Sequence, residues 1–263
     1  MRVVVAIPAR FQSVRYPGKP LVPLRGASGE ARSLVERTYR AASEASWIER
    51  IIVATDDPRI AAHANGFGAE VMMTSPDCRN GTERCAEVLS RLSPQPDILV
   101  NVQGDAPLTP PDFIDALVAG LGQADVATPV LRCDLAILAR FQNDRRHGRV
   151  GGTLAVMDRH MHALYFSKEV VPYADGIETE GDAQGVFHHV GLYAYRPAAL
   201  TQYMAWEPGH LERREGLEQL RFLENGAQIQ CVEVEARGRP FWELNNPVDV
   251  ERIERALSDA GID

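Results

Sequence analysis

The sequence has few of the features that mark zinc sites, membrane spans and nucleic-acid-binding surfaces. Its four cysteines include no pair at C-x-x-C spacing and have no histidine cluster beside them, so a zinc site is not expected. No apolar run approaches the roughly 18 residues of a membrane helix, and MRVVVAIPARF lacks the apolar length of a signal peptide. The net charge is −8, whereas nucleic-acid-binding chains usually have a basic face. We expect a cytoplasmic protein with reduced thiols and with neither nucleic-acid nor membrane partners.

Short apolar segments alternate with segments of helical periodicity through most of the chain. This alternation predicts an α/β fold with a mostly parallel central sheet, and the lack of repeats or linkers favours one domain over residues 1–263. The expected strands are Val3–Ile7, Ile51–Ala54, Glu70–Met73, Ile98–Val102, Val126–Leu131, Leu154–Met157 and Val190–Tyr195. The expected helices are Ser33–Ser46, Arg59–Asn65, Glu83–Leu92, Phe113–Leu121, Leu211–Leu223 and Val248–Leu257.

The pattern is weakest after the fifth expected strand. The segment Asp134–Gly152 is charged, and its apolar residues have no regular spacing, so we expect a loop or an insertion there. The region of about 132–200 is therefore expected to be less regular than the rest of the chain.

A basic segment follows the first expected strand. In parallel α/β sheets, ligands bind at the carboxyl ends of the strands. The segment RFQSVRYPGKPL, Arg10–Leu21, combines positive charge with Gly18: glycine lets backbone approach a phosphate, and Arg10 and Lys19 neutralise its charge. It contains neither the P-loop nor the G-x-G-x-x-G pattern, and a solvated basic loop is an equally good interpretation.

A second polar segment, NVQGDAPL, follows the fourth expected strand. It places Asp105 between Gly104 and Pro107, on a tight turn at the end of that strand. Mg²⁺ in nucleotide sites is held by one or two carboxylates together with substrate phosphates, so Asp105 is a candidate metal ligand. Taken alone, the pattern is more often that of a turn-forming aspartate.

Several sequence blocks, taken together, are specific for one enzyme family. They are IPARFQSVRYPGKPL, ATDD, NGTER, NVQGDAPL, ALYFSK, HHVGLYAYR and LEQLR, in this order. They resemble the CMP-Kdo synthetases, or 3-deoxy-manno-octulosonate cytidylyltransferases, over nearly the whole chain. The resemblance implies a single Rossmann-like nucleotidyltransferase domain, usually a homodimer, that uses CTP and Mg²⁺. The less regular region of about 132–200 is then expected to serve the acceptor and dimerisation. It also implies transfer of CMP to a small acidic acceptor, Kdo or a close 3-deoxy-2-ulosonic acid, with release of pyrophosphate.

The resemblance assigns roles to matching positions. Arg10, Lys19 and Asp105 match the residues that carry catalysis, and Asp105 also matches a Mg²⁺ ligand. The implied nucleotide-binding set is Arg10, Ser13, Lys19, Asn80, Gly81, Thr82 and Arg84. The implied acceptor-binding set is Gln103, Lys168, His189, Tyr193, Glu218 and Gln219. Without the resemblance, His189, Glu218 and Gln219 read as structural or solvated residues.

The sequence departs from the family pattern at the metal and acceptor positions. Where the family has V-D-T-P-E-D with a second Mg²⁺-binding Asp, this chain has ELNNPVD, so Asn245 takes the metal position with an oxygen but no charge. Lys168 replaces an Arg and loses two-point recognition of a carboxylate. The segment RVGGTL, Arg149–Leu154, replaces P-N-V-V-K, and an insertion-like stretch, RGASGEARS, follows the basic segment.

These departures leave three hypotheses open. Kdo or a close ulosonic acid is the first acceptor, because the positions that contact the sugar acid are retained. A relative that forms CMP-phosphonoformate in phosphonate natural-product biosynthesis is the second. The third is a catalytically inactive nucleotide-binding protein, which the neutral Asn245 keeps open.

Overall fold

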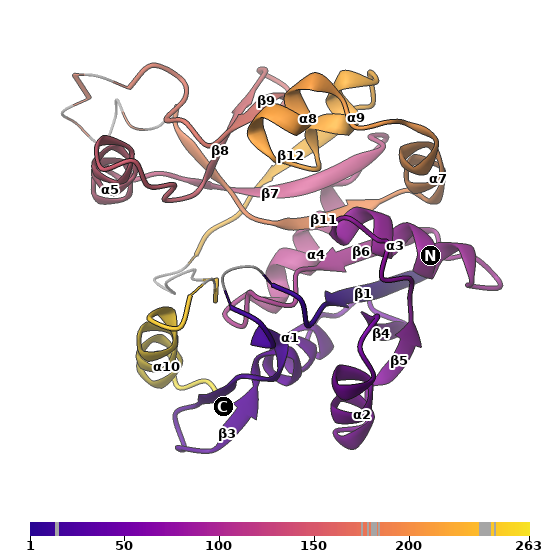
Figure 1. The fold of residues 1–263 in the computed structure, drawn as a ribbon. Helices are drawn as coiled ribbons and strands as arrows, with labels where there is room; N and C mark the ends of the chain where they lie inside the picture. Colours follow the sequence, from indigo (N-terminus) through magenta and orange to yellow (C-terminus); the bar gives the residue numbers. More distant parts are fainter. Residues whose placement is uncertain are drawn as a thin grey trace. The chain divides into compact units, whose positions relative to one another are not determined.

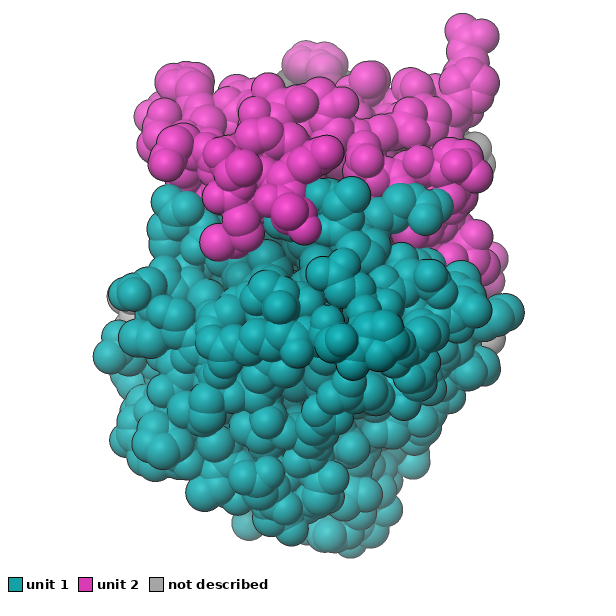
Figure 2. Space-filling view, turned by 90° about the vertical axis from the view of Figure 1, so that its right-hand side faces the viewer, with its two compact units in different colours: residues 1–115, 195–200, 236–263 teal, residues 116–194, 201–235 magenta. Residues whose placement is uncertain are grey.

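The computed structural model describes residues 1–13, 16–174, 176–177, 179, 183, 185–236, 243–244 and 246–263 (Figure 1). The chain forms two compact units. Unit 1 comprises Met1–Asp115, Tyr195–Leu200 and Ala236–Asp263, and unit 2 comprises Ala116–Ala194 and Thr201–Glu235 (Figure 2). No helix in the described part of the chain is long and apolar enough to cross a membrane.

Unit 1 contains parallel strands that are buried on both faces. Their order is β5 (Glu70–Met73), β4 (Arg50–Thr55), β1 (Val3–Ala9) and β6 (Ile98–Val102), and each neighbouring pair is parallel. Every residue of β6 is buried, which explains why its sequence is continuously apolar rather than alternating. Because the strands are parallel, the segments after β1, β4 and β6 leave the same edge of the sheet.

Short polar residues begin several helices at defined positions. The helices are α1 (Leu34–Ser43), α2 (Pro58–Gly66), α3 (Gly81–Ser90), α4 (Pro111–Gly120) and α10 (Asp249–Asp259). Ser33, Asp57 and Asn80 precede α1, α2 and α3, and each side chain accepts a hydrogen bond from a backbone N–H of the first turn. Such caps contribute about 1 kcal/mol each to stability and fix the residue at which each helix begins.

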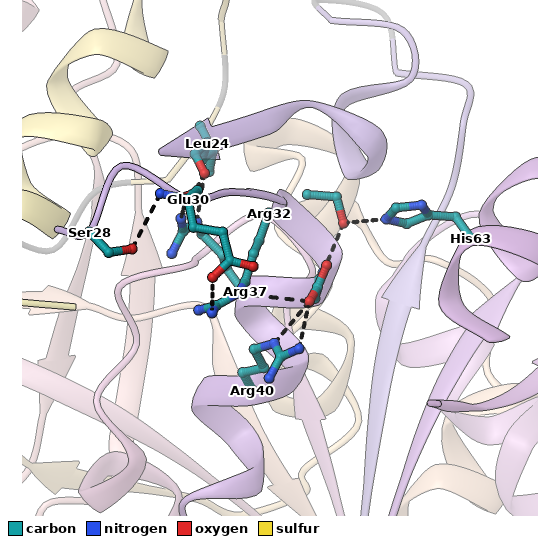
Figure 3. A network of polar contacts seen from close by, with 9 residues as sticks. Leu24, Ser28, Glu30, Arg32, Arg37, Arg40 and His63 are labelled. Carbon is teal, nitrogen blue, oxygen red and sulfur yellow. Dashed lines mark hydrogen bonds and ion pairs between the residues drawn. The ribbon is translucent and has the colours of Figure 1, made fainter. Parts of the chain in front are cut away.

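The insertion-like stretch forms a two-stranded hairpin. A short 3₁₀ helix, η1 (Lys19–Leu21), leads into β2 (Pro23–Arg25), which pairs with β3 (Ala31–Ser33). The buried Arg37 side chain of α1 donates to the carbonyl oxygens of Leu24 (3.0 and 2.7 Å) and Glu30 (3.1 Å), as Figure 3 shows. The hairpin is therefore anchored to α1 and fixes the path of the chain just after Lys19.

An apolar cluster connects this hairpin to the end of the chain. It consists of Leu24, Leu34, Leu108, Leu244, Ile253, Ala256 and Leu257. Ile253 and Leu257 lie four residues apart on α10, so they share one face of that helix. Fully burying a leucine contributes about 1.5–3 kcal/mol, and the cluster holds Leu108 and Leu244 beside the turn after β6.

Unit 2 has a mixed sheet around β7 (Val126–Arg132). Strand β12 (Ile229–Glu233) pairs with β7 in parallel, and β10 (Phe187–His189) pairs with it antiparallel. Beyond β10 lie β8 (Thr153–Met157) and then β9 (Ala163–Ser167). Strand β11 (Leu192–Tyr195) is a third neighbour of β7. The remaining helices are α5 (Leu135–Arg146), α7 (Pro197–Ala205), α8 (His210–Glu215) and α9 (Leu220–Glu224).

The predicted α/β class with a mostly parallel core is confirmed, but two expected elements are wrong. The expected loop Asp134–Gly152 contains α5, because Asp134 caps it by accepting from Ile137 N (2.7 Å) and Phe141 is buried. The expected helix Leu211–Leu223 is two helices. Gly216 ends α8 with a left-handed backbone (φ +64°), which only glycine adopts without strain.

A buried ion pair joins these two helices. Arg221 donates to Glu212 from Nε (2.7 Å) and from Nη2 (2.6 Å), and its guanidinium carbon lies 4.0 Å from the Tyr203 ring centroid. The Arg221 side chain is 1% exposed, so its charge has almost no solvent to stabilise it.

Removing Glu212 should therefore be costly. Glu212→Ala is expected to lower the free energy of unfolding by about 3–5 kcal/mol, because it leaves a buried guanidinium without its countercharge. Glu233→Ala is the matched control. It breaks an exposed pair with Arg132 (2.8 Å) and should cost less than about 1 kcal/mol. Urea unfolding followed by circular dichroism measures both, and equal losses would contradict the expectation.

Candidate functional site

An ion pair joins the basic segment after β1 to the turn after β6. Lys19 Nζ lies 2.6 Å from Asp105 Oδ2, and the two side chains are 16% and 23% exposed. The structure thus brings together two of the three residues expected to carry catalysis. The pair is accessible to a ligand, and partial burial strengthens its electrostatic interaction.

Glycine allows Asp105 to reach this position. A Cβ on Gly104 would lie 2.7 Å from the carbonyl oxygen of Pro8, closer than real contacts allow. The turn after β6 therefore lies directly against the end of β1, and the backbone N–H of Ala106 donates to Gln103 O (3.3 Å) within it. Gln103, an expected acceptor ligand, is half-buried in the same turn.

Leu244 connects both members of the ion pair to the C-terminal cluster. Its N–H donates to Asp105 O (2.8 Å), and its carbonyl oxygen accepts from Lys19 Nζ (3.2 Å). The next residue, Asn245, is the expected second metal ligand, and it lies outside the described residues. The buried Leu244 nevertheless ties the segment that carries Asn245 to the backbone of Asp105.

The remaining residues of the basic segment differ in exposure. Arg10 is exposed directly after β1, and Ser13 is half-buried. The segment is closed by a hydrogen bond from Gly18 N to Phe11 O (2.8 Å), for which Gly18 adopts φ +73°. The glycine expected to admit a phosphate thus has a second role, because it shapes the turn before Lys19.

Four of the seven expected nucleotide-binding residues lie at the start of α3, and their side chains bond mostly within the protein. Asn80 caps the helix (2.8 Å to Glu83 N), and Thr82 Oγ1 lies 2.8 Å from the Tyr195 hydroxyl. Arg84 is buried and pairs with Asp56 (3.3 Å). The side chains of these expected nucleotide ligands therefore already have partners within the protein.

Two amides lie against this helix start. A Cβ on Gly81 would lie 3.0 Å from Gln103 Nε2 and 3.1 Å from Asn101 Nδ2. Asn101 is fully buried, and neither of its amide atoms has a partner among the described residues. Asn101 has no role in the sequence interpretation; a polar residue within the apolar run ILVNV was the available signal.

In unit 2, His189 is a buried, neutral side chain. Its Nε2 lies 2.9 Å from Thr128 Oγ1, and its ring packs edge-on against Phe166 and tilted against Tyr193. Thr128 Oγ1 in turn donates to Leu192 O (2.9 Å). Burial lowers the pKa of His189 to about 3, so the ring carries no charge near neutral pH.

Glu215 holds the segment that carries Lys168. Its carboxylate accepts from Lys168 N (3.0 Å), Ser167 Oγ (2.8 Å) and Tyr165 OH (3.2 Å). Burial raises the pKa of Glu215, but these hydrogen bonds outweigh it and the net pKa lies below the ordinary value. The sequence interpretation missed Glu215; a glutamate directly before the helix-ending Gly216 was the only signal.

Glu218 and Gln219 lie in the turn before α9 rather than within a long helix. Gln219 is 2% exposed, and its Nε2 has no partner among the described residues. The carbonyl oxygen of Glu218 accepts from the Tyr203 hydroxyl (3.3 Å). A buried amide that lacks a partner is costly unless a ligand or water supplies one.

The buried His189 predicts a specific loss of stability in acid. Its pKa is 6.5 when unfolded and about 3 when folded, so the unfolded state takes up the proton first as pH falls. His189 should therefore reduce the free energy of unfolding by about 1.4 kcal/mol per pH unit below pH 6.5. His189→Gln should flatten the stability profile between pH 6.5 and 4.5, measured by urea unfolding. The exposed His210→Gln is the control, and parallel profiles for wild type and His189→Gln would contradict the burial argument.

Three kinds of comparison relate the chain to known proteins. The Cytidylyltransferase family model matches residues 4–229. The 3-deoxy-manno-octulosonate cytidylyltransferase of Maricaulis maris is 40% identical over 99% of both chains. The relative from Arabidopsis thaliana, named as mitochondrial, is 38% identical over 98% of this chain and 84% of its own.

Solved structures agree with the sequence comparisons. A structure described as CMP:2-keto-3-deoxy-manno-octonic acid synthetase complexed with CTP has a TM-score of 0.84 and 29% identity, covering 99% of this chain and 100% of that one. A 4-diphosphocytidyl-2C-methyl-D-erythritol synthase from Anaerococcus prevotii, with a TM-score of 0.59 and 15% identity over 97% and 96%, shares the fold alone.

The resemblance carried by the sequence blocks is therefore confirmed over the whole chain, as are the nucleotidyltransferase fold and the enzyme class. The family match and the full-length relatives lead to one conclusion: the chain belongs to the cytidylyltransferase family, within the 3-deoxy-manno-octulosonate cytidylyltransferases.

Proposed function

We propose that this chain transfers CMP from CTP to Kdo or a close 3-deoxy-2-ulosonic acid and releases pyrophosphate. The observation that carries the proposal is the pairing of Lys19 with Asp105 at the carboxyl edge of the unit 1 strands. The relatives are named for the ulosonic acid, and the solved synthetase described above is a complex with CTP, so both support the proposed substrates. The same names favour the ulosonic acid over phosphonoformate as the acceptor.

The chain's own contribution is to position and neutralise charge. The acceptor oxygen attacks the α-phosphorus of CTP in line, and little covalent work falls to the protein. Arg10 and Lys19 stabilise the negative charge that builds on the leaving pyrophosphate. Lys19 bonds to Asp105 in the free protein, so it exchanges a carboxylate for a phosphate when CTP binds.

The residues present fit a Mg²⁺ ion that is held jointly with the nucleotide. The described residues contain no group of three or more His, Cys, Asp or Glu side chains that could hold a metal. Mg²⁺ usually needs only one or two carboxylates plus substrate phosphates, and Asp105 supplies an ordered carboxylate. When bound, the ion would polarise the phosphate and acidify the acceptor hydroxyl. Asn245 is proposed as its second, uncharged ligand.

Side chains at the family's acceptor positions are proposed as the acceptor ligands. A polyhydroxylated acid needs several donors and acceptors, and Gln219 Nε2 is a buried donor without a partner in the described chain. The neutral His189, the neighbouring Tyr193 and Glu218 add further polar groups. Lys168, whose backbone Glu215 holds, is the cation proposed to meet the acid's carboxylate. Gln103 is a further proposed acceptor ligand.

Cellular location and assembly are proposed from the cysteines and from the family resemblance. The four cysteines are free thiols, and burial raises the pKa of Cys133 and of Cys231 to about 12, which keeps them unreactive. Free thiols fit a reducing compartment, so we place the chain in the cytoplasm. A homodimer is proposed from the family resemblance, and light scattering tests it.

A pyrophosphate-release assay tests the proposed reaction. With CTP and Mg²⁺, Kdo should support turnover, whereas UTP with Kdo, and CTP with phosphonoformate, should not. Asp105→Asn is the matched inactive variant. It should lose at least about 100-fold in turnover, because an amide cannot replace the charge of a preorganised carboxylate. Turnover with phosphonoformate alone, or a fully active Asp105→Asn, would overturn the acceptor or the role of Asp105 respectively.

Gln219 offers a test of the acceptor pocket that separates binding from folding. Gln219→Met keeps the volume but removes the amide nitrogen that has no partner among the described residues, so it should raise the acceptor KM by about tenfold through one lost hydrogen bond. The CTP KM should stay unchanged, and thermal stability should not fall. Gln228→Met, at an exposed position, is the control. An unchanged acceptor KM would show that the acid does not reach Gln219.

A further inference from the structure

The ATDD segment at the end of β4 has no part in the reaction as proposed. Its Asp57 is rigidly held: the Asp57 N–H donates to Thr55 Oγ1 (3.1 Å), and Asp57 Oδ1 accepts from Arg59 N (2.9 Å) as the cap of α2. The position of this carboxylate is therefore set by a buried strand and by a helix start.

Asp57 also orients the side chain of Arg59. The guanidinium donates from Nε to Oδ1 (2.9 Å) and from Nη2 to Oδ2 (2.6 Å). This fork-to-fork geometry fixes the plane of the guanidinium as well as its distance. The Arg59 side chain is still 59% exposed, so an isolated surface pair of this kind would contribute little to stability.

The fixed guanidinium lies on an aromatic ring of the basic segment. The Arg59 guanidinium carbon is 3.4 Å from the centroid of the Phe11 ring, a close cation–π stack. Phe11 also accepts, through its carbonyl oxygen, the hydrogen bond from Gly18 N (2.8 Å). A Cβ on Gly18 would lie 3.0 Å from the Phe11 ring atoms Cε2 and Cζ, so ring and turn are in direct contact.

These contacts form one continuous path to the ion pair. It runs from Asp57 to Arg59, across the ring to Phe11, and through Gly18 to Lys19, the first residue of η1. Lys19 Nζ then bonds to Asp105. The path connects the segment after β4 to the segment after β1. The link is made by side chains and not by the backbone hydrogen bonds that pair the two strands.

We propose that Arg59 is a positioning residue for CTP: stacked on Phe11 and oriented by Asp57, it holds the turn that presents Lys19 before the nucleotide arrives. The inference rests on the proposed function, because it takes Lys19 as a triphosphate ligand. A turn that is ordered in advance loses less conformational entropy on binding, so nucleotide affinity gains without a direct contact. Two of the Arg59 guanidinium nitrogens bond to Asp57, and its contact with the basic segment is made through the Phe11 ring.

Kinetics of single and double variants test the proposal. Arg59→Ala and Phe11→Leu should each raise the CTP KM by about threefold to tenfold, the size of one cation–π contact. The acceptor KM and kcat should stay within about twofold, because the transition-state ligands remain. The double variant should be no worse than the more affected single variant. Arg40→Ala is the control: it removes an arginine of similar exposure that pairs with Glu36 (2.8 Å) on α1.

Two results would overturn the proposal. An unchanged CTP KM in Arg59→Ala would remove Arg59 from nucleotide binding. Effects that multiply in the double variant would show that Arg59 and Phe11 act separately, with Arg59 meeting the phosphate itself.

Hydrogen exchange separates this inference from the proposed function. In the free protein, the Gly18 amide should exchange faster in Arg59→Ala and Phe11→Leu than in wild type or Arg40→Ala. This readout needs no turnover. If wild type fails to release pyrophosphate from CTP, the proposed function fails while Gly18 exchange still reports on the stack. Unchanged Gly18 exchange in both variants overturns the positioning role whatever the activity.

Discussion

The contact between Lys19 and Asp105 is the interaction on which the arrangement of the two polar segments of unit 1 depends. The two residues are far apart in sequence, and separate devices bring each one to its place. Gly104 lets Asp105 turn against the end of β1, and the closed turn at Gly18 delivers Lys19. The backbone of Leu244 hydrogen-bonds to both residues. Because Leu244 also belongs to the apolar cluster that includes residues of α10, it links the charged pair to that cluster.

In unit 2, the buried polar side chains described above are either uncharged or paired with a partner. The charge of Arg221 is matched by Glu212, and Glu215 is surrounded by three donors. His189 is uncharged because it is buried. The amide of Gln219 is the exception, since its Nε2 lacks a partner within the described chain, and such a group marks a place that a polar ligand can complete.

The elements that sequence patterns predicted well are those in which one physical signal dominates. Strand β6 is a continuous apolar run because both of its faces are buried, and its predicted bounds agree with the structure. Helix α5 was missed because only a few apolar residues, Leu138 and Phe141 among them, reach the core. The glycines of RVGGTL are explained by packing against residues distant in sequence, which a local sequence pattern does not reveal. A Cβ on Gly152 would lie 2.9 Å from Phe141 Cε1 and from His188 Nε2. For the site, residue types and strand positions made Lys19 and Asp105 candidates, and the family resemblance assigned their roles. Glu215, by contrast, holds the Lys168 segment only through contacts that folding creates.

The hydrogen bonds around Thr128 determine which nitrogen of His189 carries the proton. Thr128 Oγ1 lies 2.9 Å from Leu192 O and 3.3 Å from Val190 O, and a carbonyl oxygen can only accept. The single hydroxyl hydrogen therefore goes to these carbonyls, and the Thr128 oxygen accepts from His189 Nε2. A neutral ring has one proton, and with that proton on Nε2 the other nitrogen, Nδ1, is an acceptor. At Nδ1, this tautomer can accept a hydrogen bond from a hydroxyl group but has no hydrogen to donate to a carboxylate. If the proposed acceptor reaches this nitrogen, the ring favours a hydroxyl group over a carboxylate without carrying charge.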